Sequence, residues 1–424
     1  MSKIKLVWAV VALTIIPNIA FAQNNTNSPY TRYGYGSLAD KAFASQRAMG
    51  GIGYGLRNSS MINPMNPASY SGIDSMTFMF DMGVMAQFAW YRDEYGKERK
   101  LNGNLEYIAL QFPIMKRLGL GVGLEPFSYV GYNYGTTEKL ELIDGYAQEQ
   151  HIGNGGMSKV YGALSYNLFN RLSVGVKVAY LFGDISHNNI VFLSDQTGYN
   201  ISWIDTLRAS GLTYDFGLQY SHPAGKNKTL TVGLVYSPKL PIHGSVRKGT
   251  LRLSSGGAVI NSDNQVSTDS VFELPQSFGF GFTYNKLFNY TFGADVLYQS
   301  WADAKYYDQK NALNNRLKFN VGGEYIPNLM TNKYYNRIRY RAGLNYTNSY
   351  VKVENQGYEK SGYKEYGASV GVGLPMVDRR SFLNLTFEYS LIQPEIKTSL
   401  KEQYFRFTLS YTFNESWFFK QRLQ

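Results

Sequence analysis

The sequence lacks cysteine altogether, and this absence excludes disulfides, zinc–thiolate sites and cysteine nucleophiles. Histidine is scarce as well, since only His151, His187, His222 and His243 are present. The aspartates and glutamates are scattered, without the spacing of metal ligands. We therefore expect no metal and no cofactor.

Long hydrophobic runs are missing after the N-terminus, where no segment reaches the about twenty apolar residues of a membrane-spanning helix. The first residues are different. Lys3 and Lys5 precede an apolar run at 6–16 and a small-residue site at 20–22. This order is typical of a signal peptide, so we expect residues 1–22 to be removed on export.

Dense clusters of basic residues with interleaved aromatics are also absent. The formal net charge is +11, but the lysines and arginines are spread along the chain. A nucleic-acid surface would gather them on one face or stretch. We therefore expect no nucleic acid among the partners.

Aromatic residues and glycine, in contrast, are abundant. Aromatics make up 16% of the chain, with 36 Tyr and 25 Phe, and there are 42 Gly. In an exported protein this composition is typical of a transmembrane β-barrel, because only every second strand residue faces lipid and tyrosines form the interfacial girdles. A secreted soluble β-protein is the competing class.

Apolar and polar residues alternate from residue 75 onward. In the last predicted strand, one face is apolar and the other polar: Phe405, Phe407, Leu409, Tyr411 and Phe413 alternate with Arg406, Thr408, Ser410 and Thr412. This period predicts strands with one face toward lipid and one toward water. We place strands at 75–91, 104–112, 118–134, 157–167, 172–186, 206–220, 229–243, 271–284, 290–300, 315–325, 337–350, 363–374, 381–391 and 402–413. These are about fourteen, and a closed antiparallel barrel needs an even number.

The connections between these strands alternate in length. Short, turn-like links fall at 113–117, 168–171, 222–228, 285–289 and 375–380, and longer ones at 135–156, 187–205, 244–270, 301–314 and 352–362; the link 326–336 is an exception, too long for a tight turn. Short and long connections therefore alternate along the chain. This alternation indicates an outer-membrane barrel with periplasmic turns, extracellular loops and both termini in the periplasm. We expect a signal peptide at 1–22, an N-terminal extension and hatch at 23–74, the barrel at 75–413 and a periplasmic tail at 414–424.

The segment 44–72 is the one long irregular stretch. It is rich in Gly, Ser and Asn, has Asn63-Pro64 and Asn66-Pro67 steps, and shows no helical or strand period. Such a segment cannot bury a regular face alone. We therefore predict an all-β fold, a transmembrane antiparallel barrel with this segment as a hatch, or plug, inside the bore.

The residues of this segment resemble the N-terminal hatch of the long-chain fatty-acid transporter (FadL) family. The likeness rests on the Gln46-Arg47-Ala48-Met49-Gly50-Gly51 leader, the Asn58-Ser59-Ser60 tract and the Asn66-Pro67-Ala68-Ser69 step before a long first strand. It is sharp over the hatch and only architectural elsewhere. The resemblance implies a fourteen-stranded barrel plugged by the hatch, and passive uptake of hydrophobic compounds.

Two sets of residues are candidates for a functional role. The hatch or gating candidates are Gly50, Gly51, Asn63, Pro64, Asn66, Pro67 and Ala68, with the two asparagines expected to cap local backbone groups. The charged side chains predicted to face the lumen are Lys318, Glu324, Arg339, Arg341, Glu388 and Arg406, with Asp295 nearby. They either pair with one another and the hatch, or an arginine among them receives a carboxylate headgroup.

The favoured function is that of an outer-membrane transporter, which passes fatty-acid-like or other apolar compounds by diffusion through a hatch-gated barrel. It predicts a dry cavity and an opening in the wall, with lipid and a hydrophobic ligand as partners. The alternative is a non-transporting subunit or scaffold of a larger outer-membrane assembly, secretion or nutrient-uptake complex, with protein partners and a sealed, salt-bridged lumen. We expect no enzyme, because no histidine is placed beside an ordered serine on the wall.

Overall fold

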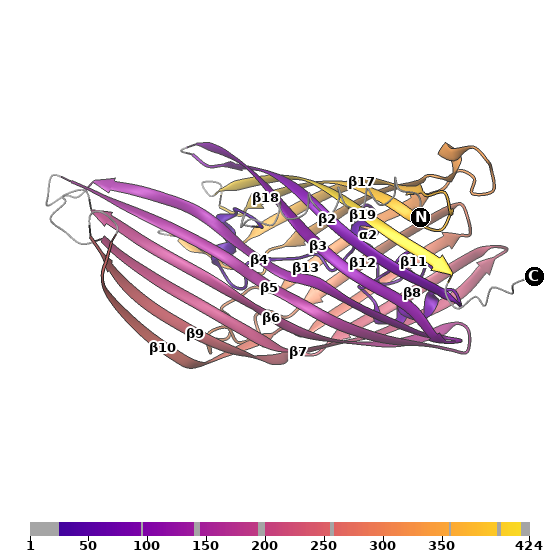
Figure 1. The fold of residues 1–424 in the computed structure, drawn as a ribbon, viewed down its shortest axis with the longest axis horizontal. Coiled ribbons are helices and arrows are strands. Elements are labelled where there is room, and N and C mark those ends of the chain that lie inside the picture. Colours follow the sequence, from indigo (N-terminus) through magenta and orange to yellow (C-terminus); the bar gives the residue numbers. More distant parts are fainter. Residues whose placement is uncertain are drawn as a thin grey trace, which may run out of the picture.

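The computed structural model describes residues 25–94, 96–139, 145–193, 200–254, 258–355, 358–396 and 400–416. Strands dominate (Figure 1). The elements that precede the barrel are η1 (Pro29–Arg32), β1 (Ser37–Leu38), α2 (Ala44–Arg47) and η2 (Pro67–Gly72). The strands of the first half are β2 (Thr77–Arg92), β3 (Lys97–Met115), β4 (Leu118–Lys139), β5 (Tyr146–Leu168), β6 (Leu172–Leu193), β7 (Asn200–Gly225), β8 (Lys228–Ser237) and β9 (Leu240–Leu253). Those of the second half are β10 (Val259–Leu274), β11 (Ser277–Lys286), β12 (Tyr290–Gln299), β13 (Arg316–Tyr325), β14 (Arg339–Asn348), β15 (Val353–Asn355), β16 (Tyr358–Ser361), β17 (Tyr363–Pro375), β18 (Phe382–Pro394) and β19 (Lys401–Ser416), with η3 (Tyr334–Arg337) between β13 and β14.

The strands form a closed antiparallel barrel with 14 strands in its wall. Each strand pairs with its neighbours in sequence, and β19 closes the ring by pairing with β2 from Ser416↔Thr77 to Lys401↔Arg92. Two of the wall positions each consist of two consecutive strands with a short interruption between them. β8 and β9 share one position, and both pair with β7. β10 and β11 share the next position, where β10 pairs with β9 and β11 pairs with β8. The interruptions hold Pro238 and Pro275, which cannot donate a ladder hydrogen bond. The predicted barrel and its strand number are confirmed.

The wall has the inverted polarity expected of a membrane barrel. In β2, Asp81 and Gln87 are buried inside while Val84 and Phe88 are exposed outside. In β19, Thr408 and Ser410 are buried and Phe405 is exposed, as the alternation predicted. The apolar outer face is the surface that contacts membrane lipid. No helix within the described ranges combines the length and apolar character needed to cross a bilayer.

Several predicted loops are strands instead. The predicted loop 135–156 is occupied by β4 as far as Lys139 and by β5 from Tyr146, and the loops 187–205 and 244–270 are likewise largely strand. Polar, glycine-containing residues pair there because both faces are wet, and an alternation of polarity no longer marks the strand. These strands run farther toward the long-loop end than the strands on the other side of the barrel (Figure 1). At the opposite end, β19 runs on to Ser416, past its predicted end at Phe413; residues 417–424 of the predicted tail and the predicted signal peptide lie outside the described residues.

Candidate functional site

The hatch, residues 44–72, lies buried inside the barrel. Its only regular elements are α2 and η2, and its local shape is held by asparagine side chains. Asn66 Oδ1 accepts from Ala68 N at 3.0 Å, and Asn63 Oδ1 accepts from Met65 N at 3.1 Å. Asn63 Nδ2 also donates to Gly53 O at 2.7 Å. Both asparagines therefore satisfy backbone groups that a buried irregular segment would otherwise leave unpaired.

The other hatch candidates are buried as well. Pro67 occupies the first position of η2, where its missing N–H costs nothing, and Ala68 and Pro64 are enclosed. Gly50 and Gly51 have φ values of +70° and +85°, a left-handed region that favours glycine.

The wall comes into close contact with the hatch at inward-facing glycines. A Cβ added at Gly233 would lie 1.8 Å from Tyr54 O, and one at Gly343 would lie 2.1 Å from Gly50 N. Gly119, Gly175, Gly217 and Gly322 meet the hatch in the same way. Backbone therefore packs directly on backbone, leaving no room for a solute between hatch and wall at these points.

Buried polar groups tie the hatch to the wall. Asp295 Oδ2 accepts from Gly53 N at 2.6 Å and from Tyr54 N at 2.9 Å. Asn320 Nδ2 donates to Gly51 O at 2.8 Å, and Thr283 Oγ1 donates to Gly55 O at 2.7 Å. These bonds come from the adjacent strands β11, β12 and β13, so they anchor the hatch to this side of the wall.

The predicted lumen charges all lie inside and most pair with opposite charges. Arg47 of the hatch bridges Glu106 and Glu388, with 2.6 Å between Arg47 Nη2 and Glu388 Oε2. Glu324 accepts from Arg341 Nε at 2.7 Å and lies 3.6 Å from Arg339 Nη1. These contacts join charges of the wall to one another and to the hatch.

Two further lumen contacts complete this set. Lys318 Nζ lies 2.5 Å from Asp40 Oδ2. Burial raises the pKa of Asp40, but Lys318 outweighs this effect and lowers it to about 2. Arg406 has neutral partners instead, Gln87 Oε1 at 2.8 Å and Ser390 Oγ at 3.3 Å.

A second part of the N-terminal region, residues 25–38, lies where two wall strands separate; we call it the strap. Pairing of β3 with β4 stops at Ile108↔Leu124, and beyond that point β3 pairs with β2 and β4 with β5. Asn27 Nδ2 donates to Asn102 Oδ1 of β3 at 3.1 Å, and β1 pairs with β4 at Leu38↔Ser128. The strap therefore bridges a seam in the barrel wall. The sequence places these residues in the N-terminal extension and predicts no role for them.

An apolar cluster, which includes Tyr35 of the strap, fills the bore at the end with the long connections. Tyr35 and Trp301 are fully buried, with ring centroids 5.8 Å apart, and Trp301 lies 4.8 Å from the ring of Tyr350. Tyr350 OH accepts from Tyr35 N at 3.0 Å. Phe272 and Tyr132 also belong to the cluster. We missed this cluster because Trp301 and Tyr350 lie outside regular strands and Tyr35 precedes the hatch.

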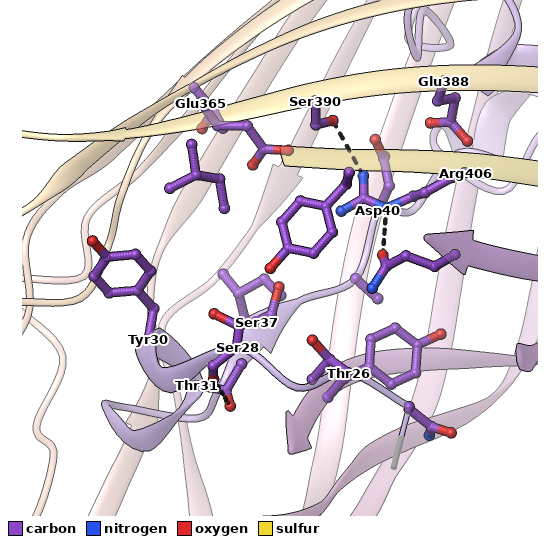
Figure 2. A pocket seen from close by; sticks show the side chains of 18 of the residues that line it. Thr26, Ser28, Tyr30, Thr31, Ser37, Asp40, Glu365, Glu388, Ser390 and Arg406 are labelled. Carbon is purple, nitrogen blue, oxygen red and sulfur yellow. Dashed lines mark hydrogen bonds between the residues drawn. The ribbon is translucent and has the colours of Figure 1, made fainter. Parts of the chain in front are cut away.

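The cavities between these layers are small and charged. One of about 100 Å³ is lined by strap residues and by Arg47, Glu106, Glu388 and Arg406. Figure 2 shows Arg406 bonded to Ser390 on the side opposite the strap residues Ser28 and Thr31. A second, of about 50 Å³, includes Lys41, Lys159 and Glu125 in its lining. Such linings suit water and ions better than hydrocarbon.

Two histidines have side-chain partners within the described residues. His187 Nδ1 lies 2.6 Å from Tyr132 OH, and His151 Nδ1 lies 2.7 Å from Asn189 Oδ1. Among the described residues, no group of His, Asp and Glu could hold a metal ion.

Comparison with solved structures places the fold among channels for hydrophobic compounds. The toluene transporter TodX of Pseudomonas putida is similar with a TM-score of 0.60 and 16% identity over 90% of this chain and 100% of that one. The CymD monoaromatic hydrocarbon channel gives 0.57 and 14% over 92% and 100%. A FadL homologue of Pseudomonas aeruginosa gives 0.56 and 14% over 89% and 99%. At these identities the likeness establishes the fold, and the resemblance to the FadL barrel seen in the sequence is confirmed at that level.

The neighbours are transporters and channels rather than enzymes. Their fold and the inverted polarity of the wall make this chain an outer-membrane protein. None of the curated proteins compared with the chain matches it in sequence. One family model, BamG, matches residues 1–424. The chain therefore belongs to the BamG family, and it has the barrel fold of the FadL-type channels.

Proposed function

We propose that this protein is a sealed outer-membrane barrel that serves as a subunit or scaffold of a larger outer-membrane assembly, secretion or nutrient-uptake complex. The observation that carries the proposal is the filling of the bore at three levels. The aromatic cluster closes the end with the long connections, the hatch with its Arg47 ion pairs packs on wall glycines deeper in the bore, and the ion pairs of Glu324 lie nearest the short turns.

A hydrophobic solute would need an apolar pocket of roughly 300 Å³ or more. The two cavities described above are smaller and charged, and they offer no such pocket. The family model that matches this chain, BamG, also carries a different name from the hydrocarbon channels that share its fold. Both observations favour a structural role over conduction.

A second candidate is passive transport of fatty-acid-like or other apolar compounds, which two observations favour. The fold is shared with the toluene transporter and the hydrocarbon channel, and the seam between β3 and β4 is a discontinuity in the wall. Transport would require the strap and hatch to move, with Gly50, Gly51 and the Asn66-Pro67-Ala68 step as the gating elements. Under either function we propose export by the signal peptide and periplasmic termini.

The deciding experiment is purification of the native barrel in mild detergent, followed by mass spectrometry of every lipid and protein that accompanies it. A stoichiometric protein partner and an empty barrel are expected. A stoichiometric hydrophobic compound without a protein partner would instead establish the transporter.

A further inference from the structure

The end of the barrel that carries the short turns has an unusual surface. Nearly every turn there exposes a large apolar side chain, and Phe169 and Val377 are 81% and 101% exposed. The full set is Met76, Ile114, Met115, Phe169, Leu287, Phe288, Met330, Tyr334, Tyr335, Met376 and Val377. We call this ring of turn residues the turn rim.

The same turns are strongly basic. Their exposed cations are Lys116, Arg117, Arg171, Lys226, Lys286, Lys333, Arg379 and Arg380, against the acidic Asp74, Asp378 and Glu415. None of these cations forms an ion pair with another residue in the described part of the chain. Apolar tips among unpaired positive charges are therefore repeated around the rim.

Membrane lipid does not account for the apolar tips. Outward-facing tyrosines near the turns, among them Tyr166, Tyr325 and Tyr340, mark the interfacial girdle. Phe169 lies three residues beyond Tyr166, in the turn that follows the end of β5 at Leu168 and on the side away from the bilayer. The turn tips therefore point into water, where large exposed apolar groups mark a protein contact.

We propose that the turn rim docks a periplasmic protein whose surface combines acidic residues with apolar pockets. This rests on the proposed function and on the predicted periplasmic orientation of the turns. The charge of the rim argues against two other occupants. A second copy of the rim would bring like charges together. The tail sequence 417–424 would do the same, because it has the basic residues Lys420 and Arg422 and no acidic side chain. An acidic partner would pair with the rim cations, while the apolar tips would fill its pockets.

The test uses the full chain in native membranes, with a photoreactive phenylalanine analogue replacing Phe169 or Val377. The matched control positions are Phe280 and Phe319, which are exposed on the lipid-facing wall. We expect the rim positions to crosslink to one acidic periplasmic protein and the wall positions to crosslink to lipid. Crosslinks from the rim to phospholipid alone would overturn the proposal.

A charge-reversal pair then tests complementarity. Arg379→Glu with Arg380→Glu should weaken co-purification of the crosslinked protein by at least about tenfold, with a similar loss for wild type at high salt. The control is Arg247→Glu with Lys248→Glu, an exposed basic pair on β9 at the other end. Heat-modifiable migration verifies that each variant is folded.

The outcomes separate the two proposals. A complex that survives the rim reversal but is lost on the β9 reversal would refute rim docking and leave the complex role intact. A barrel that brings down no protein under any condition, but carries a hydrophobic compound, would refute both.

Discussion

At the scale of single residues, Arg47 links the hatch to the wall through two ion pairs. It is buried, and its guanidinium lies between two carboxylates from different strands. Removing it would leave Glu106 and Glu388 inside the bore without their ion-pair partner. Uncompensated buried charge is one of the few single changes that costs several kcal/mol.

We predict that Arg47→Ala lowers the stability of the folded barrel by about 3–5 kcal/mol. Urea unfolding followed on SDS gels without boiling would measure the change. Arg208→Ala is the matched control, because Arg208 pairs with Asp184 on the exposed surface and its loss should leave the midpoint unchanged. Equal midpoints for both variants would contradict the role given to Arg47.

Gly233 offers a steric counterpart to this electrostatic test. Gly233→Ala places a methyl group against Tyr54 O, so the hatch must shift, and we expect a loss of about 1–3 kcal/mol and easier proteolysis of the hatch. Gly162→Ala on β5 is the control, since nothing lies within 4 Å of its added Cβ. If the hatch of both variants resists protease equally, close packing at Gly233 does not hold it.

At the scale of elements, the hatch is an irregular segment whose shape depends on a few side-chain caps. The side chain of Asn66 bonds in several directions: Oδ1 accepts from Ala68 N, and Nδ2 donates to Tyr54 O, Leu218 O and Leu234 O. Pro67 fixes the backbone at the start of η2. Together they connect the hatch to itself and to β7.

We predict that Asn66→Ala combined with Pro67→Gly leaves the barrel closed but loosens the hatch. Planar-bilayer recordings should then show a higher ion leak than wild type, with unchanged heat-modifiable migration. A leak identical to that of wild type would remove the gating role from this step.

The strands could be predicted where one face contacts lipid, because apolar and polar residues then alternate. They could not be predicted where the strands extend past the lipid. In β19 the alternation located Phe405 outside and Thr408 inside, because one face meets lipid and the other meets the bore. In the extended parts of β4 and β5 both faces contact water, so apolar and polar residues do not alternate. For this reason these strand segments were predicted as a loop. The lumen charges were predictable from register alone, whereas their partners were not: Asp40 and Arg47 lie far from Lys318 and Glu388 in sequence.

At the scale of the whole molecule, the seam between β3 and β4 distinguishes a sealed barrel from a conduit. The strap occupies this seam, and Leu38 faces Ser128 across the β1–β4 pair. Antiparallel partners have Cα atoms about 4.5–5.5 Å apart, within the range of a disulfide. The chain has no cysteine of its own to interfere.

We therefore predict that Leu38→Cys with Ser128→Cys forms a disulfide on mild oxidation, and that the locked protein keeps its partners and its function in cells. Either single variant, and the double variant under reductant, serve as controls. Loss of uptake of a hydrophobic compound on oxidation, restored by reductant, would show that the strap must leave the seam and would favour transport.

The pairing of β19 with β2 has a consequence for how the chain is made. The last strand to be synthesised closes the ring, and residues 25–72 lie inside that ring with bonds to β18 and β19 from Arg47 and Ser28. This N-terminal part of the chain must therefore wait, unfolded or loosely held, beside an open and growing sheet. Biogenesis ends in a single enclosing step that joins sequence positions more than 300 residues apart, as in the Ser28–Glu402 contact with its separation of 374. Such non-local closure is slow, and it leaves the half-built barrel in need of protection until its two ends meet.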